Sequence, residues 1–406
     1  MKVKKGVILL CLLLMLTIVP LSQAHTHYST INMQNTWMQT YGRLFNDELG
    51  SSIQQTKDGG FIVVGSKSTS LFDIHGHRDV WLLKLNETGT VMWDQTYGGP
   101  DEDDGNAVQQ TDDGGYIIVG RTRSYSNGKT DVWLIKTDEK GNKLWDTTFG
   151  YSDFDSGSEV RQTRDGCYVI IGSGNQSGGG RGEALLIKVD SDGNKVWARS
   201  FGEKGHNYAD EIQQTSDDGF IIIGSSWISG ETNSYDMWLI KTDKDGNLMW
   251  DKKFDGAGSD HGWSIGQTLD GGFIITGETY QSHGSDDNIW LVKTDENGNT
   301  QWENTFEGRG YSSQQTSDGG FIIAGATMNS TITDFSNGLL MKTDSGGNLE
   351  WRRTFGGRQP DFFFSVQQTQ DNGYVLTGYT IPWHFWFGSD LWVLKTDSEG
   401  KISLQS

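Results

Sequence analysis

Acidic residues recur at one position of a repeated sequence pattern, eight residues before a threonine. The five acids are Glu48, Asp103, Asp155, Asp260 and Asp361, and two further copies of the pattern carry Asn207 and Gly308 at this position. Carboxylates held close together attract a cation such as Ca²⁺, or raise one another's pKa so that one can act as a general acid. The five are therefore a candidate metal site. In an enzyme that cleaves glycosides, Asp103, Asp155 and Asp260 would be the catalytic residues. The alternative is structural, with each Asp capping the turn before a glycine two residues later.

Four of the 16 tryptophans stand outside the repeated pattern. They are Trp227, Trp263, Trp383 and Trp386, and the last two flank His384 in an aromatic cluster, Pro382–Phe387. Exposed aromatic rings stack on sugar rings or anchor protein partners. We therefore predict a ligand-binding site formed by Trp227, Trp263, Trp383, His384 and Trp386. The alternative is that the aromatic loop folds over the molecule and plugs its centre.

These residues are spaced by a sequence repeat that occurs seven times. Its threonine stands at positions 56, 111, 163, 215, 268, 316 and 369, followed by an Asp two residues later, an aromatic residue after five and a Gly after nine. A second block ends in Lys84, Lys136, Lys188, Lys241, Lys293, Lys342 and Lys395, and a third carries Trp93, Trp145, Trp197, Trp250, Trp302 and Trp351. Each copy predicts four strands joined by Asp-Gly-Gly and Asp-x-x-Gly-Asn turns. In every copy, the Trp and the Lys are expected to pack between neighbouring units.

The two ends of the repeat array predict a closed ring. The seventh copy lacks its Trp strand, and residues Trp37 to Gly42 match Trp93 to Gly98 of the first copy. We therefore predict an all-β, seven-bladed β-propeller over residues 35–406, in which the N-terminal strand completes the last blade. Tight turns would then share one face and variable loops the other. The five carboxylates would ring one mouth of the channel.

The repeat unit resembles that of a known group of proteins. The segment "QQTDDGGYIIVGRT" (Gln109 to Thr122) is similar to the repeat of secreted seven-bladed propellers of archaea and bacteria. That resemblance implies a cell-surface protein, sometimes with a carbohydrate-related role. The segment from Thr294 to Phe306 is also similar to the tryptophan-docking repeat of quinoprotein-type propellers, which would imply redox chemistry. Catalytic members of that class often carry adjacent cysteines, whereas this chain has two Cys, Cys11 and Cys167.

The net charge and the N-terminal residues limit the possible partners and locations of the protein. The formal net charge of −20 over 406 residues argues against nucleic acid or an anionic lipid surface as a partner. Lys2, Lys4 and Lys5, a short apolar run and Ser22-Gln23-Ala24 predict a signal peptide over residues 1–24, followed by a short segment, 25–34. We expect a secreted or envelope-exposed monomer that does not insert into a membrane once the signal peptide is removed. No cofactor is predicted, with Ca²⁺ the one candidate.

Together these features favour a binding or scaffold propeller that recognises a glycan or a surface protein through its variable loop face. This interpretation assigns no catalytic residue. The alternative is a carbohydrate-active enzyme that uses the ring carboxylates.

Overall fold

The computed structural model describes residues 31–33, 36–43, 46–68, 77–150, 153–174, 182–202, 206–228, 234–256, 258–280, 288–328, 335–381 and 388–402. Residues 1–30, which include the predicted signal peptide, lie outside this part. Every regular element described is a β-strand. None of the described segments forms a helix that could cross a membrane.

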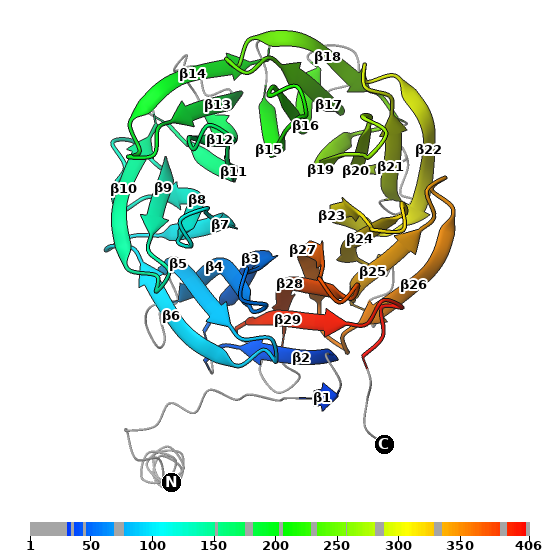
Figure 1. Ribbon diagram of the computed structural model, residues 1–406, viewed down its shortest axis with the longest axis horizontal. Coiled ribbons are helices and arrows are strands. Elements are labelled where there is room, and N and C mark those ends of the chain that lie inside the picture. Colours follow the sequence, from blue (N-terminus) through cyan, green and yellow to red (C-terminus); the bar gives the residue numbers. More distant parts are fainter. Residues whose placement is uncertain are drawn as a thin grey trace, which may run out of the picture.

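The strands form seven four-stranded antiparallel blades arranged in a ring (Figure 1), so the predicted β-propeller is confirmed. Blade 1 consists of β3 (Glu48–Gln55), β4 (Phe61–Ser68), β5 (Arg78–Leu85) and β6 (Val91–Tyr97). Blade 2 consists of β7 (Asp103–Gln110), β8 (Tyr116–Thr122), β9 (Asp131–Thr137) and β10 (Lys143–Phe149). Blade 3 consists of β11 (Ser156–Gln162), β12 (Tyr168–Gly174), β13 (Glu183–Val189) and β14 (Lys195–Phe201). Blades 4 and 5 are β15 (Asn207–Gln214), β16 (Phe220–Ile228), β17 (Ser234–Thr242) and β18 (Leu248–Phe254); and β19 (Asp260–Gln267), β20 (Phe273–Thr279), β21 (Asn288–Thr294) and β22 (Thr300–Glu307). Blade 6 is β23 (Arg309–Gln315), β24 (Phe321–Ala326), β25 (Gly338–Thr343) and β26 (Leu349–Phe355).

The seventh blade joins the two ends of the chain. Its strands are β27 (Asp361–Gln368), β28 (Tyr374–Thr380), β29 (Asp390–Thr396) and, from the N-terminal side, β2 (Thr36–Tyr41). Trp37 pairs with Lys395 and Thr40 with Trp392, as the sequence match predicted. A short strand that was not predicted, β1 (Ile31–Met33), pairs with the outer edge of β2. The ring is therefore closed by strand pairing between segments at opposite ends of the sequence.

The hydrophobic core lies between neighbouring blades. Ile62 and Leu82 of blade 1, for example, share one cluster with Ile118 and Trp133 of blade 2. The repeated outer tryptophan packs against the aromatic residue that follows the tight turn of the next blade, as in the edge-on pair Trp93–Tyr116, where the ring centroids are 5.9 Å apart. Each large side chain buried in this way contributes roughly 1.5–3 kcal/mol. The Trp column is thus an inter-blade contact, as the sequence predicted.

The repeated lysine, aspartate and threonine form one motif at the tight turns. In blade 1, the buried Lys84 ammonium donates to Asp58 Oδ1 at 3.0 Å and to the carbonyl of Leu85 at 3.1 Å. Thr56 Oγ1 donates to the same carboxylate at 2.5 Å. The lysine stem is therefore buried and its charge is paired, which neutralises a cation that would be costly to bury alone.

A ring of glutamines joins the seven blades. The second Gln of each inner strand accepts a hydrogen bond from a turn amide of the preceding blade, as Gln110 Oε1 does from Lys57 N at 2.9 Å. Gln55 Oε1 accepts from Gln370 N at 2.9 Å and so joins blade 7 to blade 1. The other members are Gln162, Gln214, Gln267, Gln315 and Gln368. This ring is unbroken, which explains why the glutamine occurs in all seven copies.

Candidate functional site

A cavity of about 920 Å³ lies along the axis of the ring and is lined by the inner strand of every blade. It extends from the middle of these strands to the tight turns, where Arg164, Leu269 and Ser317 line it. This volume is within the range of roughly 300–1,000 Å³ usual for small-molecule sites. The cavity therefore reaches the tight-turn end of the channel, whereas the sequence placed function on the opposite, variable face.

A β-bulge in each inner strand supplies one set of residues to this cavity. The register shifts after the third residue in blade 1, between Gly50 and Ser52, and at the equivalent place in the other six. The extra residues, all lining the cavity, are Ser51, Asn106, Ser158, Asp210, Trp263, Tyr311 and Phe364. Bulges re-aim side chains and recur at functional sites. Here they place aromatic residues on blades 5 to 7, small polar ones on blades 1 to 3, and an acid on blade 4.

The aromatic side of the cavity is part of a longer aromatic belt, defined here as Trp227, Tyr235, His261, Trp263, Tyr311, Phe364 and Tyr379. Successive ring centroids along it lie 4.9, 4.9, 5.9, 6.0, 5.4 and 5.8 Å apart. These distances lie in the range of favourable contacts between aromatic rings. The belt runs from Trp227, late in β16, through the cavity to Tyr379, late in β28.

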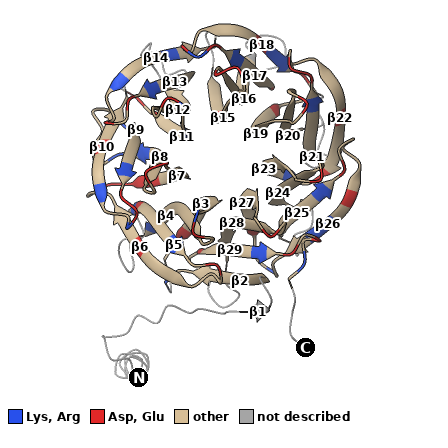
Figure 2. Ribbon diagram, viewed as in Figure 1, with Lys and Arg blue, Asp and Glu red and all other residues tan. Residues whose placement is uncertain are grey.

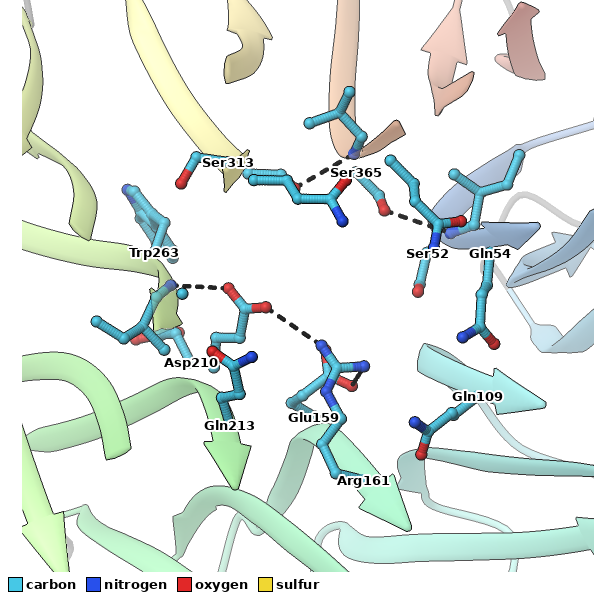
Figure 3. A pocket seen from close by; sticks show the side chains of 18 of the residues that line it. Ser52, Gln54, Gln109, Glu159, Arg161, Asp210, Gln213, Trp263, Ser313 and Ser365 are labelled. Atoms are coloured by element: carbon cyan, nitrogen blue, oxygen red, sulfur yellow. Dashed lines mark hydrogen bonds and ion pairs between the residues drawn. The ribbon is translucent and has the colours of Figure 1, made fainter. Parts of the chain in front are cut away.

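An acidic group stands beside the belt on blades 3 and 4. The Arg161 guanidinium lies 3.2 Å from a Glu159 oxygen and 3.3 Å from a Glu211 oxygen. Glu211 Oε2 also accepts from the backbone N–H of Ile265 at 2.9 Å. Figure 3 shows Glu159, Arg161 and Asp210 facing the interior of the cavity, with Trp263 nearby. The group therefore contains one cation, paired with Glu159 and Glu211, and a third acid, Asp210, that is not paired with it.

Burial shifts the acids of this group toward their neutral forms. Loss of surrounding water raises the pKa of Asp210 to about 7 and is the sole cause. The same effect dominates at Glu159 and raises its pKa to about 7 although Arg161 opposes it. Within the described residues, Asp210 forms no hydrogen bond or ion pair. Asp210 is therefore available both to hydrogen-bond a ligand and to exchange a proton near neutral pH.

The predicted aromatic site is only partly within the described structure. Trp227 and Trp263 lie in one belt, linked through Tyr235 and His261. Trp383, His384 and Trp386 lie outside the described residues, so their part in a site stays a prediction. Thr380 and Ile381, which follow Tyr379 of the belt, are the last described residues before that segment.

The five predicted carboxylates do not ring the mouth of the channel. Glu48, Asp103, Asp155, Asp260 and Asp361 are at most 1% exposed, and none of them lines the cavity. Asp103 accepts from Gly99 N at 3.0 Å, from Ser124 Oγ at 2.7 Å and from Thr122. Asp361 likewise accepts from Gly357 N and Thr380. These contacts anchor the chain between blades, because the carboxylate supplies acceptors for loop amides that would otherwise be unpaired. Metal binding or catalysis by this set stays a prediction.

The residues of the cavity could have been found by comparing the seven copies at one further position. The position five residues before the repeat threonine differs in chemistry from blade to blade, and of its seven residues our sequence prediction included only Trp263. Glu159 and Glu211 stand one position later, and Arg161 replaces the first Gln of its pair.

The comparisons with known proteins support the fold alone. No family model matches the chain, and no curated protein matches it. An ulvan lyase of a new polysaccharide lyase family, bound to -[GlcA(1-4)Rha3S]-, is 11% identical with a TM-score of 0.57, over 89% of this chain and 96% of that one. The Pan2 WD40 domain of Neurospora crassa is 9% identical with a TM-score of 0.52, over 88% of this chain and 91% of that domain. The propeller domain of the Trilobed protease of Pyrococcus furiosus is 9% identical with a TM-score of 0.50, over 89% and 95%. At these identities the likeness defines the class, a β-propeller.

Proposed function

We propose that this chain is a secreted or envelope-exposed propeller that binds a glycan in its central cavity. The observation that carries the proposal is the distribution of the bulge residues around the cavity, with aromatic rings on blades 5 to 7 and polar side chains on blades 1 to 4. A sugar ring has an apolar face that stacks on aromatic side chains and an edge of hydroxyl groups. The two sides of the cavity match the two parts of such a ligand.

The hydrogen-bonding side is suited to hydroxyl groups. Ser51, Asn106 and Gln109 carry both donors and acceptors, although Asn106 Nδ2 already donates to Gly157 and Gln109 Oε1 already accepts from Gln162. Glu211 and Asp210 carry carboxylate oxygens. Arg161 adds a cation, which is already in contact with Glu159 and Glu211. A concave cavity of this kind also suits an oligosaccharide better than a folded protein, since protein interfaces are broader.

Glycan binding can be tested on an array with the purified chain, followed by titration of any sugar that binds. The variant Trp263→Ala is expected to weaken binding about tenfold or more, because it removes a central stacking surface. Trp302→Ala is the matched control, since Trp302 packs against Phe321 on the outer side of blade 5. It should lower stability and leave affinity unchanged. An array without binding, or equal affinities for Trp263→Ala and the parent chain, would overturn the proposal.

A second candidate function, cleavage of the bound glycan, rests on Asp210. Its carboxyl group lines the cavity, has no partner among the described residues, and has a pKa raised by burial to about 7. If the protein is an enzyme, Asp210→Asn should abolish turnover of the bound sugar and preserve its binding. A parent chain that binds the sugar and releases no product would exclude this function for that sugar.

A further inference from the structure

Three carboxylates meet on the connection between blades 4 and 5. Asp236 lies on β17, Asp255 directly follows β18, and Asp260 is the first residue of β19. One oxygen from each lies within 4.8 Å of the other two. Within the described residues none of the three forms an ion pair with a lysine or arginine. Like charges this close repel one another, and a cation or a proton shared between them relieves the repulsion.

The Asp236 side chain gives a second, independent indication of a ligand. The residue is 3% exposed, and its Oδ1 has no hydrogen-bond partner within the described chain. Buried carboxylate oxygens are normally paired or bound to a metal, because an unpaired one loses its hydration without compensation. The unpaired oxygen belongs to a residue that faces two other acids. A bound cation would satisfy all three carboxylates at once.

The third carboxylate is a departure from the repeat. Five of the other blades have glycine at the position of Asp255: Gly42, Gly98, Gly150, Gly202 and Gly356. In blade 1, a Cβ atom at Gly98 would lie 1.9 Å from Oδ1 of Asp79, the equivalent of Asp236. In blade 1, glycine therefore leaves room for the strand carboxylate to pack against this position. Blade 4 places a third acid there instead.

We propose that Asp236, Asp255 and Asp260 bind a divalent cation of the Ca²⁺ type. All three donors are oxygens, and hard cations such as Ca²⁺ take six to eight oxygen ligands with flexible geometry. Asp255 is exposed, so it gives the ion a path of entry and leaves room for water ligands. The hydroxyl oxygen of Thr279 lies near Gly256 and the Asp260 carboxylate, and it could serve as a further ligand.

The site is adjacent to the aromatic belt. Tyr235 precedes Asp236 and His261 follows Asp260, and the two rings lie 4.9 Å apart. Successive side chains of a strand point to opposite faces. A cation bound by Asp236 and Asp260 would hold β17 and β19 together, and Tyr235 and His261 lie on the opposite faces of these two strands. This consequence does not depend on what the cavity binds.

Calcium titration of the full chain, freed of metal with EDTA and then desalted, tests the site. We expect one site per chain, with a Kd of about 10⁻⁴ to 10⁻³ M if it resembles extracellular calcium modules. Asp255→Asn and Asp236→Asn should each weaken binding at least tenfold. The matched control is Asp79→Asn, because Asp79 occupies the position of Asp236 in blade 1 but has Gly98 beside it. This control should bind Ca²⁺ like the parent chain.

Thermal unfolding gives a second measurement. Asp255→Asn should raise Tm in EDTA, since it removes repulsion, and should lose the rise in Tm that Ca²⁺ gives the parent chain. A residue that only supports the fold would lower Tm in both conditions. The proposal is overturned if no Ca²⁺ binds at millimolar concentration, or if both variants bind as the parent does. Since Asp255 is exposed, its variant still provides the test should Asp236→Asn fail to fold.

Discussion

Each of the seven inner strands carries a bulge and ends at a tight turn, but the residues at the turns repeat around the ring and those at the bulges do not. At the turns, each blade repeats the same Lys–Asp–Thr motif, and seven glutamines close one hydrogen-bonded ring. At the bulges, one position holds Ser, Asn, Asp, Trp, Tyr or Phe, depending on the blade. Charged residues occur on every blade (Figure 2), whereas the aromatic bulge residues are confined to blades 5 to 7. Positions that repeat in all seven blades maintain the ring, and positions that differ between blades give the cavity its two sides.

The largest effect is expected at the closure of the ring. Trp37 of β2 is fully buried, and its Nε1 donates to the carbonyl of Glu87 at 2.9 Å. Trp37→Ala should lower the free energy of unfolding by about 3–5 kcal/mol, measured by urea denaturation. Trp145→Ala is the control, because Trp145 is the equivalent residue of blade 2 and is only half-buried. This substitution should lower the free energy of unfolding by less. Equal losses would mean that the closing blade is no more sensitive than the others.

Buried acids of the inner strands and the acids of the tight turns should also respond to pH in opposite directions. Burial raises the pKa of Glu48 to about 8 and that of Asp210 to about 7. At the turns, partial burial alone would raise the pKa of Asp113, but hydrogen bonds from Lys136, Thr111 and Gly115 outweigh it and hold the pKa at about 2.

Raised carboxyl pKa values mean that the folded chain binds more protons than the unfolded one, so stability should fall as pH rises from about 5 to 8. Depressed values have the opposite effect, and stability should fall as pH drops from about 4 to 2. Thermal unfolding in EDTA should therefore show a maximum Tm near about pH 4 to 5. A Tm that rises steadily up to pH 8 would contradict this.

One substitution would give the cavity a glutamine that most other blades have at the same position. Gly266 replaces the first Gln of its pair, and a Cβ atom there would contact only Ile274, at 3.4 Å. In other blades this Gln accepts from the neighbouring strand, as Gln54 Oε1 does from Gln110 N at 2.7 Å. Gly266→Gln should therefore raise stability by about 1 kcal/mol and weaken glycan binding, because it fills space near Trp263. Higher stability with unchanged affinity would place the ligand elsewhere.

The smallest effect concerns the one copy that lacks the second turn glycine. Cys167 replaces the second turn glycine, and at the equivalent Gly115 a Cβ atom would lie 2.7 Å from Lys136 Nζ. Accordingly, the Lys188 side chain is 12% exposed, against 2–6% for its six equivalents. Cys167→Gly should let Lys188 donate to the carbonyl of Val189. The gain should be about 0.5 kcal/mol after the entropic cost of glycine. Cys167→Ser keeps the Cβ atom and should show no gain.

The architecture was predictable from sequence because every part of it occurs seven times. Repetition revealed the strands, the turns and the Trp and Lys columns, and the match of Trp37 to Trp93 revealed the closure. The cavity was less predictable. A bulge interrupts the alternation of side chains along each inner strand, so periodicity alone does not tell which residues face the channel. The burial of Asp103 and Asp361 also depends on the neighbouring loop, which an isolated strand pattern does not contain.

The pairing of β2 with β29 has a consequence for the order of assembly. Elsewhere in the ring, hydrogen-bonded strands are neighbours in sequence, whereas Trp37 and Lys395 are separated by nearly the whole chain. The entropy cost of joining distant segments grows only slowly with their separation, so this contact forms readily once the intervening blades have assembled. It should be the last to form and the first to part. A mechanical force applied through the residues before β1 would act on this strand first and would open the circle before any complete blade unfolds.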